Sequence, residues 1–129
     1  MSERMCIVLV SGQREQLQMA GMMASVGAVS GMDVTVFVSM NALRYFVKGS
    51  TEAAPAEGEM GRLMEQKKAP AFRTLFEQAA TLGDAKIHPC TMAMDIMGIE
   101  KEGLESYMGE SLGLTKFLSD AQGAQVWSF

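Results

Sequence analysis

The chain has 129 residues, a length typical of one globular domain built around one hydrophobic core. Apolar residues make up 48% of the sequence and charged residues 20%, which excludes an intrinsically disordered chain. The formal net charge is -4, and the densest basic cluster is the pair Lys67-Lys68, so neither a nucleic acid nor an anionic membrane is expected as a partner.

One short apolar run, Cys6 to Val10, lies near the start of the sequence. It is too brief for the apolar region of a signal peptide, about 7–15 residues, or for a membrane span. We therefore expect a cytoplasmic protein without an integral membrane segment. In that compartment Cys6 and Cys90 are expected to be thiols, and with one histidine and no metal-ligand spacing we expect no metal and no cofactor.

The first part of the sequence predicts a strand, a helix and a second strand. The apolar run 5–10 is typical of a strand buried on both faces, and residues 34–38 give the clearest strand pattern. Between them, residues 13–30 have helical periodicity, and Gly31 is placed to end the helix. Glycines inside a helix cost about 1 kcal/mol each, so those of 13–30 indicate close packing of this helix against the sheet.

After the second strand the pattern becomes less regular. Ser39 or Asn41 is placed to cap a short helix that runs to Val47. Residues 48–68 have no stable periodicity, although 59–68 are compatible with a mobile helix. Two interpretations of 48–68 stay open: a plain surface loop, or a mobile flap near the carboxyl edge of the sheet.

The rest of the sequence alternates helices with short strands. The expected elements are a helix over 69–82 ended by Gly83, a strand over 86–89, a helix over 90–97, a strand over 104–108, a helix over 113–121 and a strand over 125–129. Short connections between strands and helices predict right-handed βαβ units. We therefore expect a single α/β domain over 1–129, with helices on both faces of a mainly parallel sheet of about five strands.

Cys90 is the leading candidate for the chemistry of this protein. It is predicted to lie where a strand passes into a helix, at the carboxyl edge of the sheet, where open α/β sheets bind ligands. The free N–H groups of a helix start stabilise a thiolate, and after Pro89 those of Thr91 and Met92 are the expected donors to the sulfur. The alternative is that Cys90 is a small buried hydrophobic residue at a strand end.

The candidate partners of Cys90 are Cys6, His88 and Asp95. Cys6 is expected at the opposite edge of the sheet, more than about 10 Å away, which is too far for a disulfide. His88 shares a strand face with Cys90 but lies about 6.6 Å along the strand, so tuning the site, moving a proton through water and a purely structural role all stay open. Asp95 is placed to cap or orient the helix. Without a close base, protease chemistry is not expected.

Thirteen methionines are unusual for this length. Two interpretations stay open: adaptable filling of the core, or an adaptable apolar surface for a partner or a second subunit. The methionines that cluster on the two predicted helices are Met19, Met22, Met23, Met92, Met94 and Met97.

Residues 90–99 read Cys-Thr-Met-Ala-Met-Asp-Ile-Met-Gly-Ile, which resembles the signature of the DsrE/DsrF-like family of sulfur-relay proteins. The likeness is to the peroxiredoxin-like DsrE branch, in which a cysteine begins a methionine-rich helix. Residues 36–43 and the Ser11-Gly12 turn, followed by a helix of small residues, resemble the same branch. The resemblance covers nearly the whole chain except 48–68, which looks shortened.

This resemblance implies a flavodoxin-like three-layer sandwich and a cytoplasmic homo-oligomer, such as a trimer or hexamer. It also implies that Cys90 carries sulfur as a persulfide or an S-bound thiosulfonate. The implied partners are a rhodanese-type sulfurtransferase and a TusA-like sulfur carrier. Asn41 matches the family pattern after the second strand. The supporting residues are then Thr91, Met92, Asp95, His88, Asn41 and Ser11.

The leading hypothesis is a cytoplasmic sulfur carrier or sulfurtransferase that acts through Cys90. A second hypothesis is a non-catalytic oligomeric assembly or regulatory module that uses the methionine surface. A third is a flavodoxin-like binder of a nucleotide, a flavin or another small ligand. The loop 11–14 has one hydroxyl and one glycine, which are few of the features of a phosphate-binding loop.

Overall fold

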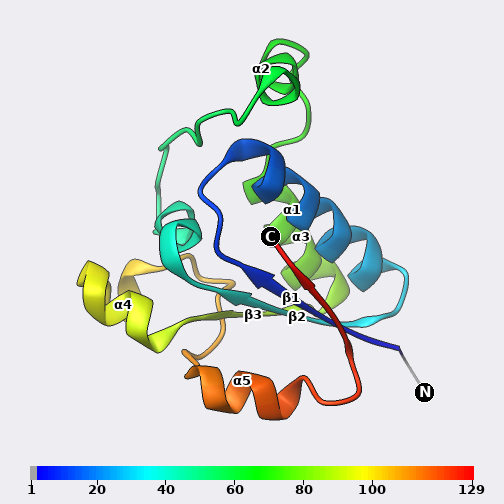
Figure 1. The fold of residues 1–129 in the computed structure, drawn as a ribbon, viewed down its shortest axis with the longest axis vertical. Coiled ribbons are helices and arrows are strands. Elements are labelled where there is room, and N and C mark those ends of the chain that lie inside the picture. The colour runs from blue at the N-terminus through cyan, green and yellow to red at the C-terminus, as the bar shows by residue number, and fades with distance from the viewer. Residues whose placement is uncertain (1–2) are drawn as a thin grey trace.

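The computed structural model describes residues 3–129, which form a four-stranded sheet with helices on both faces (Figure 1). All neighbouring strands are parallel, in the order β3-β2-β1-β4. The three-layer α/β fold predicted from the sequence is therefore confirmed. The elements are β1 (Arg4–Leu9), α1 (Arg14–Val29), β2 (Asp33–Val38), the 3₁₀ helix η1 (Met40–Phe46), α2 (Glu59–Gln66), α3 (Phe72–Gly83), β3 (Lys86–Pro89), α4 (Thr91–Met97), the 3₁₀ helix η2 (Lys101–Gly103), α5 (Leu114–Asp120) and β4 (Gln125–Ser128).

Helices α1 and α3 cover one face of the sheet and α5 covers the other (Figure 1). On the α5 side, Phe117 stacks on Phe37 of β2 with the ring centroids 4.8 Å apart. On the other side, Phe76 of α3 meets Phe46 of η1 edge to face at 5.2 Å. Side chains alternate between the faces of a strand, so β2 supplies both layers of the core.

The glycines of α1 allow close packing, against the sheet at Gly27, as the sequence predicts, and against helix α3 at Gly21. A Cβ atom on Gly27 would lie 2.7 Å from Cε of Met5, and one on Gly21 would lie 3.3 Å from Cβ of Leu75 in α3. Gly31 follows α1 with φ of 96°, which confirms its predicted role at the helix end.

Gly83 does not end its helix in the predicted way. It is the last residue of α3, and Asp84 takes the left-handed conformation with φ of 58°. The reason for glycine at position 83 is contact with α1, because a Cβ there would lie 2.5 Å from Cβ of Ala28. Tertiary packing, and not the helix cap, explains this residue.

The strand expected over 104–108 is not formed, and the sheet has four strands instead of about five. Leu104 makes a single bridge to Val47, and the Met108 N–H donates to the Glu105 carbonyl at 3.0 Å, so the chain turns here. Both Leu104 and Met108 are buried, while Ser106 between them is exposed. A strand would have placed all three on one face, so the burial pattern fits a turn.

The helix expected after β2 forms as a 3₁₀ helix, without the predicted cap. Ser39 precedes η1 but makes no capping hydrogen bond through its side chain, and Asn41 lies inside the element. Residues of η1 are fixed instead by burial of Leu43 and Phe46 in the core. Core packing replaces local capping at this helix start.

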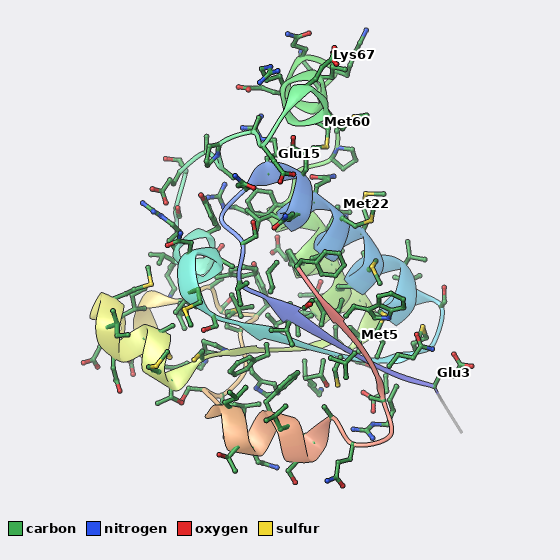
Figure 2. All side chains as sticks on the ribbon, in the orientation of Figure 1. Glu3, Met5, Glu15, Met22, Met60 and Lys67 are labelled. Carbon is green, nitrogen blue, oxygen red and sulfur yellow. The ribbon has the colours of Figure 1, made fainter. Side chains whose placement is uncertain are left out.

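The segment 48–68 is attached to the start of α1. The Glu15 carboxylate accepts hydrogen bonds from the backbone N–H groups of Glu57 (2.7 Å), Gly58 (2.7 Å) and Gly61 (3.0 Å). Figure 2 shows Glu15 at the start of α1, beneath α2. These bonds lower the pKa of Glu15 to about 2. A helix forms over Glu59–Gln66, close to the predicted 59–68, and the mobility of this segment stays a prediction.

Candidate functional site

Cys90 lies at the junction of β3 and α4, as the sequence predicts. Its N–H donates to the Val38 carbonyl at 2.8 Å, which continues the ladder between β2 and β3. Its own carbonyl accepts the Met94 N–H at 3.0 Å, the first bond of the helix. The residue is 6% exposed. Cys90 is therefore held by backbone bonds on both sides, at the carboxyl ends of two parallel strands.

Pro89 is suited to the outer edge of the sheet. Its carbonyl accepts the Leu112 N–H at 3.0 Å, on the side of β3 away from β2. A proline lacks the N–H that a central strand would need, so it is tolerated where the ladder ends. The neighbouring Ile87 carbonyl accepts the Gly109 N–H at 2.7 Å, so residues 109–112 cover this edge.

Thr91 does not offer its backbone N–H to the sulfur. That group donates to the Leu112 carbonyl at 3.0 Å, so the prediction for Thr91 is wrong. The physical reason is that residues 109–112 run beside β3 and reach the first residue of α4. Met92 remains as the second of the two expected donors, and the side chains of Thr91 and Met92 are both exposed.

His88 is tied to the segment that covers β3. Its Nδ1 lies 2.7 Å from the Glu110 carbonyl, and a carbonyl only accepts, so Nδ1 carries the proton and donates. Gly109 lies against the ring, since a Cβ there would be 3.1 Å from Nδ1. In the neutral ring, Nε2 is then the acceptor. The observed contact is structural and joins β3 to residues 109–112.

Asp95 lies on the exposed side of α4, and its carboxylate makes no hydrogen bond or ion pair with residues 3–129. Its backbone carbonyl accepts the Gly98 N–H at 3.3 Å as the helix ends. The structure therefore brings Asp95 into no contact that would cap or orient the helix start.

Ser11 and Asn41 come together at the carboxyl edge. Both line a polar hollow of about 540 Å³, together with the side chain of Arg44. Gly12 lies against Asn41, because a Cβ on it would be 3.0 Å from Cβ of Asn41. The Tyr45 hydroxyl donates to the Gly12 carbonyl at 2.9 Å. The loop after β1 is thus packed onto the segment after β2.

Two of the N–H groups that a phosphate could use in this loop are already engaged. The Gln13 N–H donates to Oγ of Ser11 at 3.0 Å, and the Arg14 N–H donates to the Pro55 carbonyl at 2.9 Å. Arg44 makes two bonds to the Glu52 carboxylate, at 2.6 and 2.8 Å. A nucleotide or flavin phosphate would have to displace these partners.

A second, mainly apolar hollow lies between the start of η1 and α4, the helix that follows Cys90, and sulfur atoms gather around α4 in Figure 2. Cys90 itself does not line it. We call it the methionine groove, and its volume is about 340 Å³. It is lined by Met40, Asn41, Met92, Ala93, Ile96 and Met97. Asn41 therefore borders both hollows.

Met40 and Ile96 are groove residues that sequence reasoning missed. For Ile96 a signal existed: α4 has seven residues and is apolar on several sides, so part of its apolar surface must stay exposed. Ile96 is 75% exposed, whereas Ala93 and Met94 are buried. For Met40 no signal existed, because its place opposite α4 depends on the pairing of β2 with β3.

The two cysteines are free and far apart, as predicted. Cys6 pairs with Thr35 in β2, which is level with Lys86 at the start of β3. Cys90 lies four residues beyond Lys86, which is about 13 Å along the strands. Burial raises the pKa of the Cys6 thiol above its ordinary value of 9.0, with a smaller opposing effect of Arg4.

The methionines divide into buried and exposed residues, and the use of the exposed ones as a surface for a partner stays a prediction. Met5 and Met108 are buried in the core, whereas Met19 and Met22 on α1 and Met92 on α4 are exposed. The exposed methionines of α1 border another apolar groove, of about 350 Å³, beside β1.

Two kinds of feature are absent from residues 3–129. No group of three or more histidine, cysteine, aspartate or glutamate side chains is arranged to hold a metal ion. Nor does any helix of this part of the chain have the length and apolar character needed to cross a bilayer.

Comparisons with known proteins agree with this fold. The model of the DsrE/DsrF/DrsH-like family matches residues 53–129, which include β3, Cys90 and α4. The structure of the ychN protein from E. coli covers the whole of both chains at 17% identity and a TM-score of 0.67. That of MTH1491 from Methanobacterium thermoautotrophicum, a protein of unknown function, covers 99% of this chain and 100% of its own, at 8% identity and a TM-score of 0.68. No curated protein matches the sequence.

Proposed function

Because the chain belongs to the DsrE/DsrF/DrsH-like family, we propose that it is a sulfur carrier or sulfurtransferase that holds sulfur on Cys90 and passes it to a partner protein. The observation that carries the proposal is the position of Cys90, which caps α4 at the carboxyl ends of β2 and β3. Open α/β sheets bind their ligands at this edge. The family match also includes this residue.

The loading step is a displacement at sulfur. The Cys90 thiolate attacks an inner sulfur of tetrathionate, a new S–S bond forms, the central S–S bond of tetrathionate breaks, and thiosulfate leaves with the electron pair. The product is an S-bound thiosulfonate on Cys90. With a polysulfide donor the same attack yields a persulfide and a polysulfide shorter by one sulfur. Both reactions need the cysteine as a thiolate, and the N–H of Met92 is the expected donor that remains to stabilise it.

The fixed surroundings of Cys90 support holding sulfur over cutting a peptide bond. A cysteine protease needs an imidazole within hydrogen-bond reach of the sulfur. His88, the one histidine of the sequence, has its Nδ1 engaged with the Glu110 carbonyl. Cys6, the other thiol, is about 13 Å away along the strands and does not resolve an adduct on Cys90 as a disulfide.

The test is the intact mass of the protein after incubation with tetrathionate or polysulfide. One thiosulfonate or persulfide adduct is expected on the wild-type chain and on Cys6→Ser, the matched control, and none on Cys90→Ser. Reduction with a thiol should remove the adduct. An adduct that persists on Cys90→Ser, or no adduct on the wild-type chain, would contradict the proposal.

The proposed setting is the cytoplasm, with a rhodanese-type sulfurtransferase as donor and a TusA-like carrier as acceptor. We also propose a homo-oligomer, such as a trimer or hexamer. Exposure of the edge strand supports self-association: all four residues of β4 are exposed, and Trp127 is 48% exposed beside Val126. Exposed apolar side chains on an unpaired edge strand favour pairing with another chain. Light scattering measures the assembly directly.

A further inference from the structure

The net negative charge of this chain is that of one stretch of sequence, residues 90–112, which begins at Cys90. Residues 90–112 contain five of the 15 acidic residues and one of the 11 basic residues, so this stretch alone carries the net charge of -4. The remaining residues are balanced. The acidic residues of the stretch are Asp95, Glu100, Glu102, Glu105 and Glu110.

Little within the structure neutralises these carboxylates. Lys101, the one basic residue of the stretch, donates to the Met108 carbonyl at 3.0 Å. Among residues 3–129 the three ion pairs join Arg14 to Glu65, Arg44 to Glu52 and Lys116 to Asp120, and none includes a residue of 90–112. Asp95, Glu100, Glu102 and Glu110 are exposed, whereas Glu105 is half-buried.

One wall of the methionine groove, formed by α4, belongs to this acidic stretch, and the exposed Asp95 lies on the same helix. The wall begins at Met92, two residues after Cys90, and continues to the exposed Ile96. Methionine side chains are flexible and polarisable, so they adapt to the shape of an incoming apolar group. An exposed apolar patch next to polar residues is typical of a protein-binding surface.

We propose that the methionine groove is the docking site of the protein that exchanges sulfur with Cys90, and that this partner presents an apolar side chain surrounded by lysines or arginines. This inference rests on the proposed function. Opposite charges steer a partner to its site and exclude partners of the wrong charge. The local excess of carboxylates favours a basic partner, and the groove binds the apolar side chain that this partner presents.

A second copy of this chain is a poorer occupant. In a two-fold contact it would bring the same acidic stretch to the groove, so like charges would meet there. Self-association through β4, where the exposed side chains are Val126 and Trp127, meets no such obstacle.

The transfer step balances without another reactant. The partner's cysteine thiolate attacks the outer sulfur of the Cys90 persulfide, and a new S–S bond forms on the partner. The S–S bond to Cys90 breaks, Cys90 leaves as a thiolate, and the proton stays on the transferred sulfur. No atom is oxidised or reduced overall, because one persulfide is exchanged for another.

The experiment uses the full chain, loaded with polysulfide and freed of excess donor. Two synthetic peptides of equal length act as acceptors, each with one cysteine and a Leu-Met tip, one rich in lysine and one rich in glutamate. The intact masses of both reactants give the rate of transfer. At low salt the lysine peptide is expected to react about tenfold faster, and the ratio falls towards one near 1 M salt, where the Debye length is about 3 Å.

Two pairs of variants separate the groove from the charge. Ile96→Ser is expected to slow transfer to the lysine peptide about tenfold, whereas Val26→Ser, at a comparably exposed site on α1, leaves it unchanged. Removing two charges by Glu100→Gln with Glu102→Gln should slow the lysine peptide several-fold and raise the rate of the glutamate peptide. The matched control is Glu57→Gln with Glu59→Gln near α2, also exposed.

The outcomes distinguish failure of the proposed function from failure of the docking proposal. If Cys90 does not load with polysulfide, the proposed function fails. If it loads but both peptides react equally at low salt, or if Ile96→Ser and Val26→Ser behave alike, the docking proposal fails alone. Dissociation of the oligomer by Ile96→Ser, seen by light scattering, would identify the groove as a contact between copies and would also overturn the proposal.

Discussion

The two cysteines of this chain differ in their positions along the sheet much more than in their burial. Cys6 is 3% exposed and Cys90 is 6% exposed. Cys6, however, lies within β1, with β2 on one side and β4 on the other. Cys90 lies beyond the last residue of β3, where a helix begins and a groove opens. Exposure alone would not separate the two residues, whereas their distance from the carboxyl edge does.

The largest effect on this difference between the two cysteines is expected from Phe117→Ala. Phe117 stacks on Phe37, which lies in register between Val8 of β1 and His88 of β3, midway between the two cysteines. Loss of the ring should lower the free energy of unfolding by about 3–5 kcal/mol. Denaturant titration measures this loss, and alkylation of Cys6 in native buffer should rise with it. An unchanged free energy of unfolding would mean that α5 does not cover this face in solution.

A smaller effect is expected from Cys6→Ser, which tests whether Cys6 serves stability only. A buried hydroxyl without a partner should cost about 1–3 kcal/mol of stability, while loading of Cys90 stays intact. Burial raises the pKa of Cys6 in the folded state, so its contribution to stability is present below pH 9 and falls above it, where the unfolded chain ionises first. The free energy of unfolding measured from pH 8 to 10 should therefore fall more steeply for the wild-type chain than for Cys6→Ser. Equal slopes would contradict this.

The smallest effect is expected at α2, a region that touches neither cysteine. Hydrogen bonds from three backbone N–H groups hold the pKa of Glu15 at about 2, so their contribution is present above about pH 4.5 and is lost as the pH falls towards 2. Cleavage by pepsin within 50–68 should accelerate over this range. Gly61→Ala should release the segment already at neutral pH, because a Cβ there would lie 2.5 Å from Oε1 of Glu15.

For Gly61→Ala at neutral pH, the alkylation of Cys6 and Cys90 should stay at its wild-type rate. Faster alkylation of Cys90 on release of α2 would show that the segment 48–68 also guards the candidate site, as the flap interpretation requires.

Sequence reasoning succeeds where neighbouring residues decide the outcome. The apolar runs of β1 and β2 form strands, Gly31 follows α1 in a left-handed conformation, and Cys90 lies between a strand and a helix. Each of these features depends on backbone preferences and side-chain periodicity within a few residues. The position of Cys90 at the carboxyl edge follows as well, because parallel strands place their carboxyl ends together.

Contacts between distant parts of the chain could not be predicted in this way. The Thr91 N–H is used by Leu112, and the ring of His88 is held by Glu110, 22 residues further on. Both contacts exist because residues 104–112 turn and cover the edge of β3 instead of forming a fifth strand. Whether this segment turns or forms a strand depends on which of its side chains pack into the core, and its own periodicity does not indicate the outcome.

Local patterns are enough to predict the strand-to-helix position of Cys90 and the abundance of methionine around it. Three features needed the folded chain: Met40 faces α4 across a groove, Glu15 holds the segment before α2, and Cys6 and Cys90 lie at opposite ends of one sheet face. The physical reason is that local preferences act over one or two turns of chain. Burial and hydrogen bonding between segments select one packing among those that the local preferences allow.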